Sequence, residues 1–447
     1  MTRRTDQLKL GAFLANSGHH IAAWRHPLAQ ADASQDFEHF KAVARSAERG
    51  KFDALFIADV VALWGHHLDA LSRTARAEHF EPLTLMSALA AVTERIGLIA
   101  TATTSYNEPY HIARKFASLD HLSNGRAAWN LVTSVVSDEA WNFGRESHID
   151  HTDRYQRAEE FHDVVKGLWD SWDDDAFVRD KASGRYFDPD KLHTLNHKGE
   201  HFSVRGPLNV ARPPQGHPVV VQAGASDAGK ALAARVADVI FAAHHELPAA
   251  QAFYQDIKQR AGALGRDPEH IKILPGVTPF IADTREQAQA LYEEFQALID
   301  PVLGLRLLAD TLGDDIDLSG YDLDGPLPDT PPGQRGSRRD NLLQLARRDN
   351  LSIRQLYLRL AGGNPVIGTP SDIADSFEHW FQARGCDGFN VFFPYYPGAI
   401  DTFVDQVIPL LQQRGLFRHD YSGSTLREHL GLPRPINRFS HTVQAPV

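Results

Sequence analysis

The sequence predicts an α/β fold, a (β/α)8 TIM barrel with segments inserted at its carboxyl-terminal face and a C-terminal extension. The first observation is that short apolar, β-rich runs alternate with longer helix-periodic stretches. The second is that this alternation occurs eight times within 447 residues, a length that suits one elaborated barrel. The third is that no glycine fingerprint follows the first apolar run, which disfavours an open doubly wound sheet.

Each barrel element is expected from its own stretch of sequence. The expected strands are apolar runs at 10–14, 54–58, 96–101, 127–132, 219–223, 239–242, 271–281 and 388–393. The expected helices have apolar residues three or four apart and cover 37–49, 83–93, 111–122, 155–172, 227–237, 249–264, 285–299 and 400–414.

Three segments, 16–36, 173–217 and 300–368, are too long for simple connections and are interpreted as insertions. The second carries a hairpin signal at Lys198-Gly199. The third contains an acidic, turn-rich tract, which fits a mobile flap near the active face or a solvated loop equally well. With an extension at about 416–447, we expect a single barrel domain over 1–447.

Composition excludes several classes of function. A formal charge of −11 and a pI near 6.1 leave no basic surface for nucleic acid. No apolar run is long enough to cross a bilayer, and the first ten residues lack a signal-peptide core, so we expect a soluble, cytoplasmic protein without a membrane partner. Cys386 is the single cysteine, which excludes an internal disulfide and a thiolate cluster within one chain.

The most informative stretch runs from Pro218 to Val236, where an apolar strand turns through Gly224 directly into an amphipathic helix. Such a turn directs free backbone amides, and here the Ser226 hydroxyl, at whatever lies above the strand. An anion, typically the phosphate of a cofactor, fits best. The alternative is that Ser226 merely caps the helix.

Polar residues at the ends of expected strands are further candidates, because barrel enzymes place their working residues there. Asp59 is suited to accept a hydrogen bond from a ligand N–H, or to cap the following turn. The Thr101 hydroxyl faces either the barrel mouth or neighbouring backbone. In or just after the fourth strand, the residues able to point into the mouth are Asn130, Thr133 and Ser134.

His151 and Tyr155 lie four apart at the start of a long helix, so they share one face and both reach towards one ligand. Beside a helix N-terminus they form a second candidate anion contact. The alternative is a solvated first turn.

Twenty-three histidines suggest a metal-dependent barrel hydrolase as a competing class. The first strand nevertheless lacks His-x-His, and no His-Glu-x-x-His run occurs, so no metal is expected. Gly-x-Ser-x-Gly and phosphate-loop motifs are absent too, which disfavours serine hydrolysis and nucleotide hydrolysis.

The stretch from Pro109 to Ser134 resembles the signature of the bacterial-luciferase-like flavin monooxygenases. Within that superfamily the chain is similar to the branch of nitrilotriacetate, dibenzothiophene sulfone and long-chain alkane monooxygenases. Matching pieces extend almost from end to end, at 50–59, 80–82, 142–144, 222–226 and 421–431.

The resemblance implies a two-component monooxygenase whose FMN arrives as FMNH2 from a separate NAD(P)H:flavin reductase. It places Asp59 and Thr101 near the isoalloxazine, and His151, Tyr155 and Ser226 near the ribityl phosphate. A flavin peroxide formed with O2 would oxygenate a small-molecule substrate, by C–N or C–S cleavage or by alkane or sulfone oxidation. A homodimer or homotetramer is also implied.

Such chemistry needs a lid and an apolar wall that exclude water. The segments around Trp24 and 301–368, with Tyr395 and Tyr396, are candidates for these. His20, Arg25 and His26 are candidate catalytic residues that orient substrate or peroxide, or else tether their loop through salt bridges. Alternatives to the monooxygenase are a deazaflavin-dependent oxidoreductase, a flavin-binding protein without turnover and the metal-dependent hydrolase.

Overall fold

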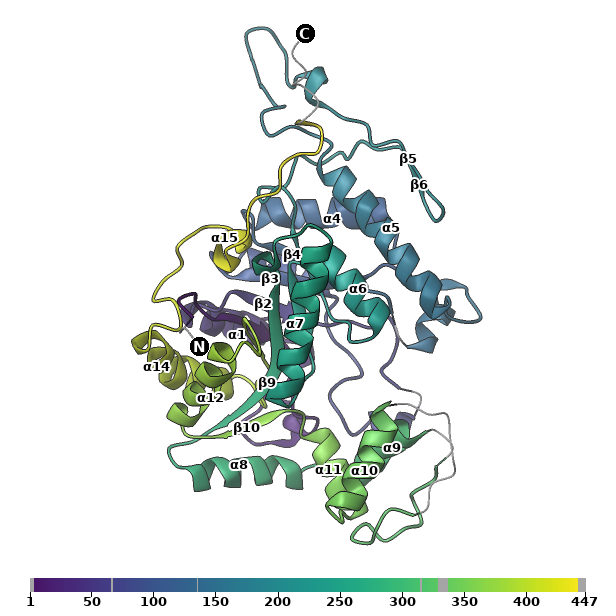
Figure 1. The fold of residues 1–447 in the computed structure, drawn as a ribbon, viewed down its shortest axis with the longest axis vertical. Coiled ribbons are helices and arrows are strands. Elements are labelled where there is room, and N and C mark those ends of the chain that lie inside the picture. The colour runs from purple at the N-terminus through teal and green to yellow at the C-terminus, as the bar shows by residue number, and fades with distance from the viewer. Residues whose placement is uncertain (1–3, 66, 135, 314–315, 329–336, 441–447) are drawn as a thin grey trace.

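A closed barrel of parallel strands forms the centre of the computed structural model, which describes residues 4–65, 67–134, 136–313, 316–328 and 337–440 (Figure 1). The strands are β1 (Lys9–Phe13), β2 (Ala54–Ile57), β3 (Gly97–Thr103), β4 (Ala127–Val132), β7 (Val219–Gln222), β8 (Val239–Ala242), β9 (Lys272–Ile281) and β11 (Gly388–Val391). They pair in this order, and β11 pairs with both β9 and β1 to close the ring. The predicted TIM barrel is confirmed, with each strand within two residues of its expected bounds.

The barrel strands are apolar because helices cover them outside and side chains fill them inside. All residues of β2 and β3 are buried, as parallel strands require. Small residues line up across the first three strands, with Gly11 opposite Ala54 and Ala54 opposite Gly97.

Helices surround this barrel and begin at its carboxyl-terminal face. They are α1 (Phe37–Arg49), α3 (Pro82–Ala90), α4 (Pro109–Leu122), α5 (His151–Trp169), α6 (Asp227–Val236), α7 (Leu247–Ala263), α12 (Pro370–Gln382), α13 (Gly398–Thr402), a π-helical turn (Phe403–Val407) and α14 (Ile408–Gln413). The sequence analysis missed α12, although Thr369, Pro370 and Asp372 form a regular helix start with a capping box.

The third insertion is largely helical outside its acidic tract. It follows α8 (Arg285–Ala297), the helix expected after β9, and contains α9 (Pro301–Leu312), α10 (Ser337–Arg348), α11 (Ile353–Ala361) and β10 (Pro365–Gly368), which pairs with the end of β9. The helices α9 to α11 form a lobe at the lower right of Figure 1. Leucines at helical spacing, among them Leu303, Leu308 and Leu356, give this lobe its own apolar core. Residues 316–328 of the acidic tract form turns.

Smaller elements complete the chain. The predicted hairpin in the second insertion is present as β5 (His197–Lys198) and β6 (Ser203–Val204), and Glu160 of α5 accepts hydrogen bonds from the amides of His201 and Phe202. The other short elements are α2 (Leu68–Leu71), α15 (Leu426–Leu430) and the helical turns Ala23–Arg25, Ala33–Gln35, Ser137–Phe143, Pro189–Lys191 and Pro268–His270. Within the described ranges no helix is both long and apolar enough to span a membrane.

Candidate active site at the barrel mouth

Thr101 and Asn130 form a buried pair where β3 and β4 lie side by side. The Asn130 Nδ2 donates to Thr101 Oγ1 over 2.8 Å, and the Thr101 hydroxyl donates to the carbonyl of Ile57 over 2.7 Å. Asn130 Oδ1 is buried without a hydrogen bond in the described structure. The Thr101 proton is therefore used by backbone, and the acceptor left for a ligand belongs to Asn130.

Ser134 belongs to a second polar cluster, after the end of β4. Its hydroxyl lies 2.7 Å from Thr103 Oγ1 and donates to Glu139 Oε2 over 2.7 Å. The Thr133 carbonyl accepts the hydroxyl of Ser105 over 2.7 Å. These bonds shape the β4 loop, and the sequence analysis missed Glu139 because it lies in a short helical turn without a recognisable motif.

Asp59, directly beyond β2, lies beside His79. His79 Nε2 is 2.8 Å from Asp59 Oδ1, and this hydrogen bond raises the pKa of His79. The other carboxylate oxygen has no hydrogen-bond partner among the described residues. One oxygen thus anchors the loop before α3, and the other is open to a ligand.

Ser226 is the N-cap of α6, and its hydroxyl oxygen accepts the amide of Gly229 over 3.1 Å. The cap uses a lone pair of the oxygen, so the hydroxyl proton is still available to a ligand. The first helical turn also leaves the amides of Asp227 and Ala228 without intrahelical partners. A Cβ on Gly224 would lie 2.9 Å from the Cα of Gly229, so glycine permits this close turn.

Tyr155, one turn into α5, lies level with the start of α6. Both helices follow parallel strands and run in the same direction, and Arg235 of α6 forms a 2.6 Å ion pair with Asp163 of α5. Tyr155 lies eight residues before Asp163 and Ser226 nine before Arg235, so equal rise along the helices brings Tyr155 level with Ser226. Tyr155 is partly buried against the barrel core. The side chain of His151 lies outside the described residues.

His20, Arg25 and His26 fasten the first insertion to the C-terminal end of α8. His20 Nε2 lies 3.1 Å from Gln296 Oε1, and burial lowers the pKa of His20 to about 4. The His26 ring stacks on Phe295 with centroids 4.2 Å apart, and Arg25 donates to the carbonyl of Leu298. These contacts fit the alternative that the three residues tether their loop, and the suggestion that they orient a substrate or peroxide stays a prediction.

Two further wall candidates also have structural roles. Tyr396 is fully buried, and its hydroxyl donates to the carbonyl of Phe13 over 2.6 Å. Tyr395 stacks on Phe295 with centroids 5.5 Å apart. Trp24 donates to the carbonyl of Arg73 over 3.1 Å, which joins the first insertion to the loop before α3.

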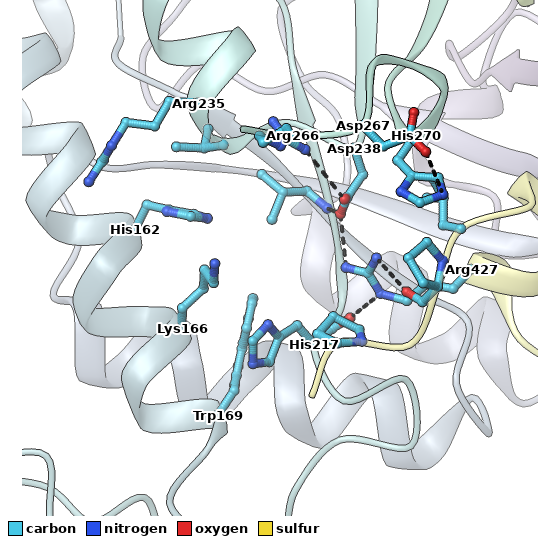
Figure 2. Close-up of a pocket in the computed structure, with 15 residues that line it drawn as sticks. His162, Lys166, Trp169, His217, Arg235, Asp238, Arg266, Asp267, His270 and Arg427 are labelled. Carbon is cyan, nitrogen blue, oxygen red and sulfur yellow. Dashed lines mark hydrogen bonds and ion pairs between the residues drawn. The ribbon is translucent and has the colours of Figure 1, made fainter. Parts of the chain in front are cut away.

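A cavity of about 420 Å³ lies at the other end of the barrel, beside the amino-terminal ends of β7 and β8 (Figure 2). His162 and Lys166 project into it from α5. Arg427, from the C-terminal extension, donates to Asp238 Oδ2 over 2.9 Å and to the carbonyl of His217 over 2.8 Å. This buried ion pair attaches the extension to the barrel, far from the polar strand ends at the mouth.

A family comparison decides what kind of barrel this is. The family model described as luciferase-like monooxygenase matches residues 17–388. The chain belongs to the luciferase-like monooxygenase family. It is accordingly a flavin-dependent monooxygenase, and the metal-dependent hydrolase considered above is wrong.

Individual relatives of this monooxygenase extend over nearly its full length. It is 56% identical to N-acetyl-S-(2-succino)cysteine monooxygenase of Bacillus subtilis (strain 168), covering 98% of this chain and 100% of that one. It is 52% identical to nitrilotriacetate monooxygenase component A of Aminobacter aminovorans, covering 96% and 98%. The second of these relatives confirms the predicted branch of the superfamily.

A solved structure supports the same assignment. Riboflavin lyase, determined with modified FMN and riboflavin, has a TM-score of 0.83 at 31% identity and covers 98% of each chain. The whole barrel with its insertions is therefore shared with a flavin-binding protein.

Proposed function

We propose that this chain is the oxygenating component of a two-component monooxygenase that uses FMNH2 and O2 to oxygenate a small organic substrate. The observation that carries the proposal is the turn from β7 into α6, where Ser226 and two closely packed glycines expose a helix N-terminus. A phosphate is the group that such a turn binds best.

The phosphate end of FMN fits the residues present. The Ser226 proton and the amides of Asp227 and Ala228 are donors to phosphate oxygens, and the helix dipole favours the negative charge. The carboxylate of Asp227, which would repel a phosphate, forms a 2.6 Å ion pair with Arg260. Tyr155 lies level with this turn and is the second hydroxyl donor.

The flavin end fits as well. Asn130 Oδ1 is a buried acceptor without a hydrogen bond in the described structure, and the register with Val221 of β7 directs the Asn130 side chain to the inside of the barrel. Unsatisfied buried acceptors are costly unless a ligand donates to them. The ring N–H and the ribityl hydroxyls of a flavin are suitable donors, and the free oxygen of Asp59 is a second acceptor.

Reduced FMN, when bound, would supply the two electrons that allow one oxygen atom of O2 to enter the substrate and the other to leave as water. The chain's own residues bind the phosphate, orient the ring through Asn130 and Asp59, and exclude water with the aromatic side chains around the mouth. Phe13, Phe56 and Phe241 pack together there, with centroid distances of 4.5 and 4.6 Å.

A separate NAD(P)H:flavin reductase is the proposed functional partner. One relative is named as component A of its monooxygenase, which indicates a second component in that system. The relatives are named for substrates with a carbon–sulfur or carbon–nitrogen bond, and we propose the same classes of bond here.

The test is anaerobic titration of the protein with photoreduced FMN, followed by turnover with a separate flavin reductase, NADH and catalase. We expect tight binding of FMNH2, weaker binding by Ser226→Ala, and label from isotopically enriched O2 in the product. Failure to bind FMNH2, or oxidation of NADH without a labelled organic product for every organic acid, sulfide and sulfone tried, would contradict the proposal.

A further inference from the structure

A recess of about 320 Å³ opens beside the barrel mouth, where the third insertion meets two barrel loops. The segment between β2 and α3, which contains α2, and the helix α9 both contribute lining residues. The first insertion and the β4 loop contribute the others. Its apolar lining comes from Ile21, Leu71, Val136, Leu303 and Leu307.

Arg76 is the unusual group in this recess. Its guanidinium donates to the carbonyl of His19 over 2.8 Å, and no carboxylate lies within ion-pair distance of it among the described residues. Arg76 is exposed, so its guanidinium is accessible from the recess. A guanidinium without a carboxylate partner is suited to form charge-assisted hydrogen bonds with an anion that enters the recess.

Neighbouring arginines show the contrast. Arg73 forms ion pairs with Asp69 over 3.0 Å and with Asp300 over 3.1 Å. Arg306, which also lines the recess, is paired with Asp310 of its own helix. The unbalanced positive charge of the recess is therefore that of Arg76.

Thr74 adds a second unmatched group to the same recess. Its Oγ1 is buried and has no hydrogen bond within the described part of the chain. A carboxylate matches this pair, because it accepts two parallel hydrogen bonds from a guanidinium and another from a hydroxyl. The apolar walls suit the carbon skeleton that carries such a carboxylate.

The recess also leads to the proposed site of oxygenation. The His19 carbonyl binds Arg76, and the His19 ring packs on Phe13 at the end of β1, with centroids 4.2 Å apart. On the other side, Val136 lies two residues beyond Ser134 of the β4 loop. The recess therefore adjoins the barrel mouth through His19 and the β4 loop.

We propose that this recess binds a carboxylate of an anionic organic substrate, with Arg76 as the ion-pair partner and Thr74 as the hydroxyl donor. The inference rests on the proposed monooxygenase function and specifies its substrate class. It makes Arg76 a specificity-determining residue, because a neutral substrate would leave the guanidinium charge unpaired.

Calorimetric titration of the full-length protein tests this without flavin, reductase or O2. The probes are N-acetyl-S-(2-succino)cysteine, nitrilotriacetate and succinate, each compared with its fully esterified form. We expect at least one acid to bind and its ester to bind about ten-fold more weakly or not at all. Equal binding of acid and ester, or no binding of any of the three acids, would overturn the proposal.

Substitutions of Arg76 and Thr74 test whether these residues bind the acid. Arg76→Gln should weaken binding of the acid by about ten-fold or more, and Arg76→Lys, which keeps the charge but loses the two-pronged geometry, by less. Thr74→Val should have a smaller effect in the same direction. Arg73→Gln removes an arginine that already has two carboxylate partners and is the matched control, with acid binding unchanged.

Two outcomes would count against Arg76. An Arg76→Gln protein that binds FMNH2 and the acid as the wild type does would refute its role. An equal loss in Arg73→Gln would show that general charge, and not this recess, attracts the anion. Since no flavin takes part in the binding test, its failure is distinguishable from a failure of the FMN proposal.

Discussion

Asp59 and His79 are joined by a 2.8 Å hydrogen bond that closes the loop between β2 and α3 at the barrel mouth. The contact raises the pKa of His79 above its ordinary value of 6.5. Because this loop carries both Thr74 and Arg76, the Asp59–His79 pair couples the proposed flavin site to the proposed substrate recess.

Asp59→Asn should change how the stability of the protein depends on pH. A histidine whose folded pKa is raised contributes stability that is complete below about pH 6.5 and is lost as pH rises through the folded pKa. The variant should therefore lose more stability at about pH 6 than at about pH 8.5, by less than about 1 kcal/mol because the pair is partly exposed. Urea unfolding at both pH values, with an NMR titration of His79, checks this, and an unchanged pKa of His79 would contradict it.

Ser226→Ala should lower both stability and FMN affinity. Losing the cap of α6 costs about 1 kcal/mol, and the phosphate loses one donor. Ser352→Ala is a matched control, because Ser352 caps α11 through the amide of Gln355 over 3.2 Å in the inserted lobe. Thermal unfolding should show similar losses for both variants, whereas fluorescence titration with FMN should distinguish them. Equal FMN affinity in both proteins would remove Ser226 from the phosphate site.

Gly229→Ala should destabilise the protein, although alanine is the better helix former. The new Cβ would lie 3.0 Å from the Cα of Gly224 and would force the turn apart, at a cost of about 1–3 kcal/mol and with weaker binding of FMN. Gly262→Ala, in α7, places its Cβ in ordinary contact with Pro268 at 3.7 Å and should instead stabilise by about 0.5–1 kcal/mol. Urea unfolding should show a loss of stability for Gly229→Ala and a gain for Gly262→Ala. A gain for both variants would show that the turn tolerates a side chain.

Arg427→Gln should weaken the attachment of the C-terminal extension. Its partner Asp238 would stay largely buried and keep only the longer ion pair with Arg266 at 4.0 Å, so we expect a cost of about 1–3 kcal/mol. Arg434→Gln breaks an exposed pair with Asp174 in the same extension and should cost less than about 1 kcal/mol. Denaturant unfolding measures both losses, and the KM of folded Arg427→Gln should be that of the wild type. A changed KM would indicate that this end of the barrel communicates with the mouth.

Local patterns predicted the barrel because its strands and helices carry strong periodicity. Strands such as β3 and β7 are continuous apolar runs, and the start of α6 is marked by Gly224 and Ser226. The helices of the third insertion were missed because an acidic, turn-rich tract dominates the segment around them. The leucines of α9 were still readable as a helix stripe.

For the site residues too, the sequence identified those with a local signal and did not show their contacts in space. The sequence brought attention to Asp59, Thr101 and Ser226 because each ends a strand or begins a helix. It did not show that the Thr101 proton is taken by Ile57, or that Glu139 holds Ser134. The sequence also suggested substrate roles for His20 and His26. In the structure both side chains contact α8, and a contact with a helix so far along the chain leaves no local signal in the sequence.

The sequence by itself determined the barrel, the family resemblance and the turn at Ser226, since each depends on residues that are neighbours in the chain. Only the tertiary structure decided which charges are balanced. Arg73 and Arg76 are three residues apart and look alike in sequence, but Asp300 reaches the first and no described carboxylate reaches the second. Ion pairing depends on distances in space, and the insertion that supplies Asp300 lies more than two hundred residues away along the chain.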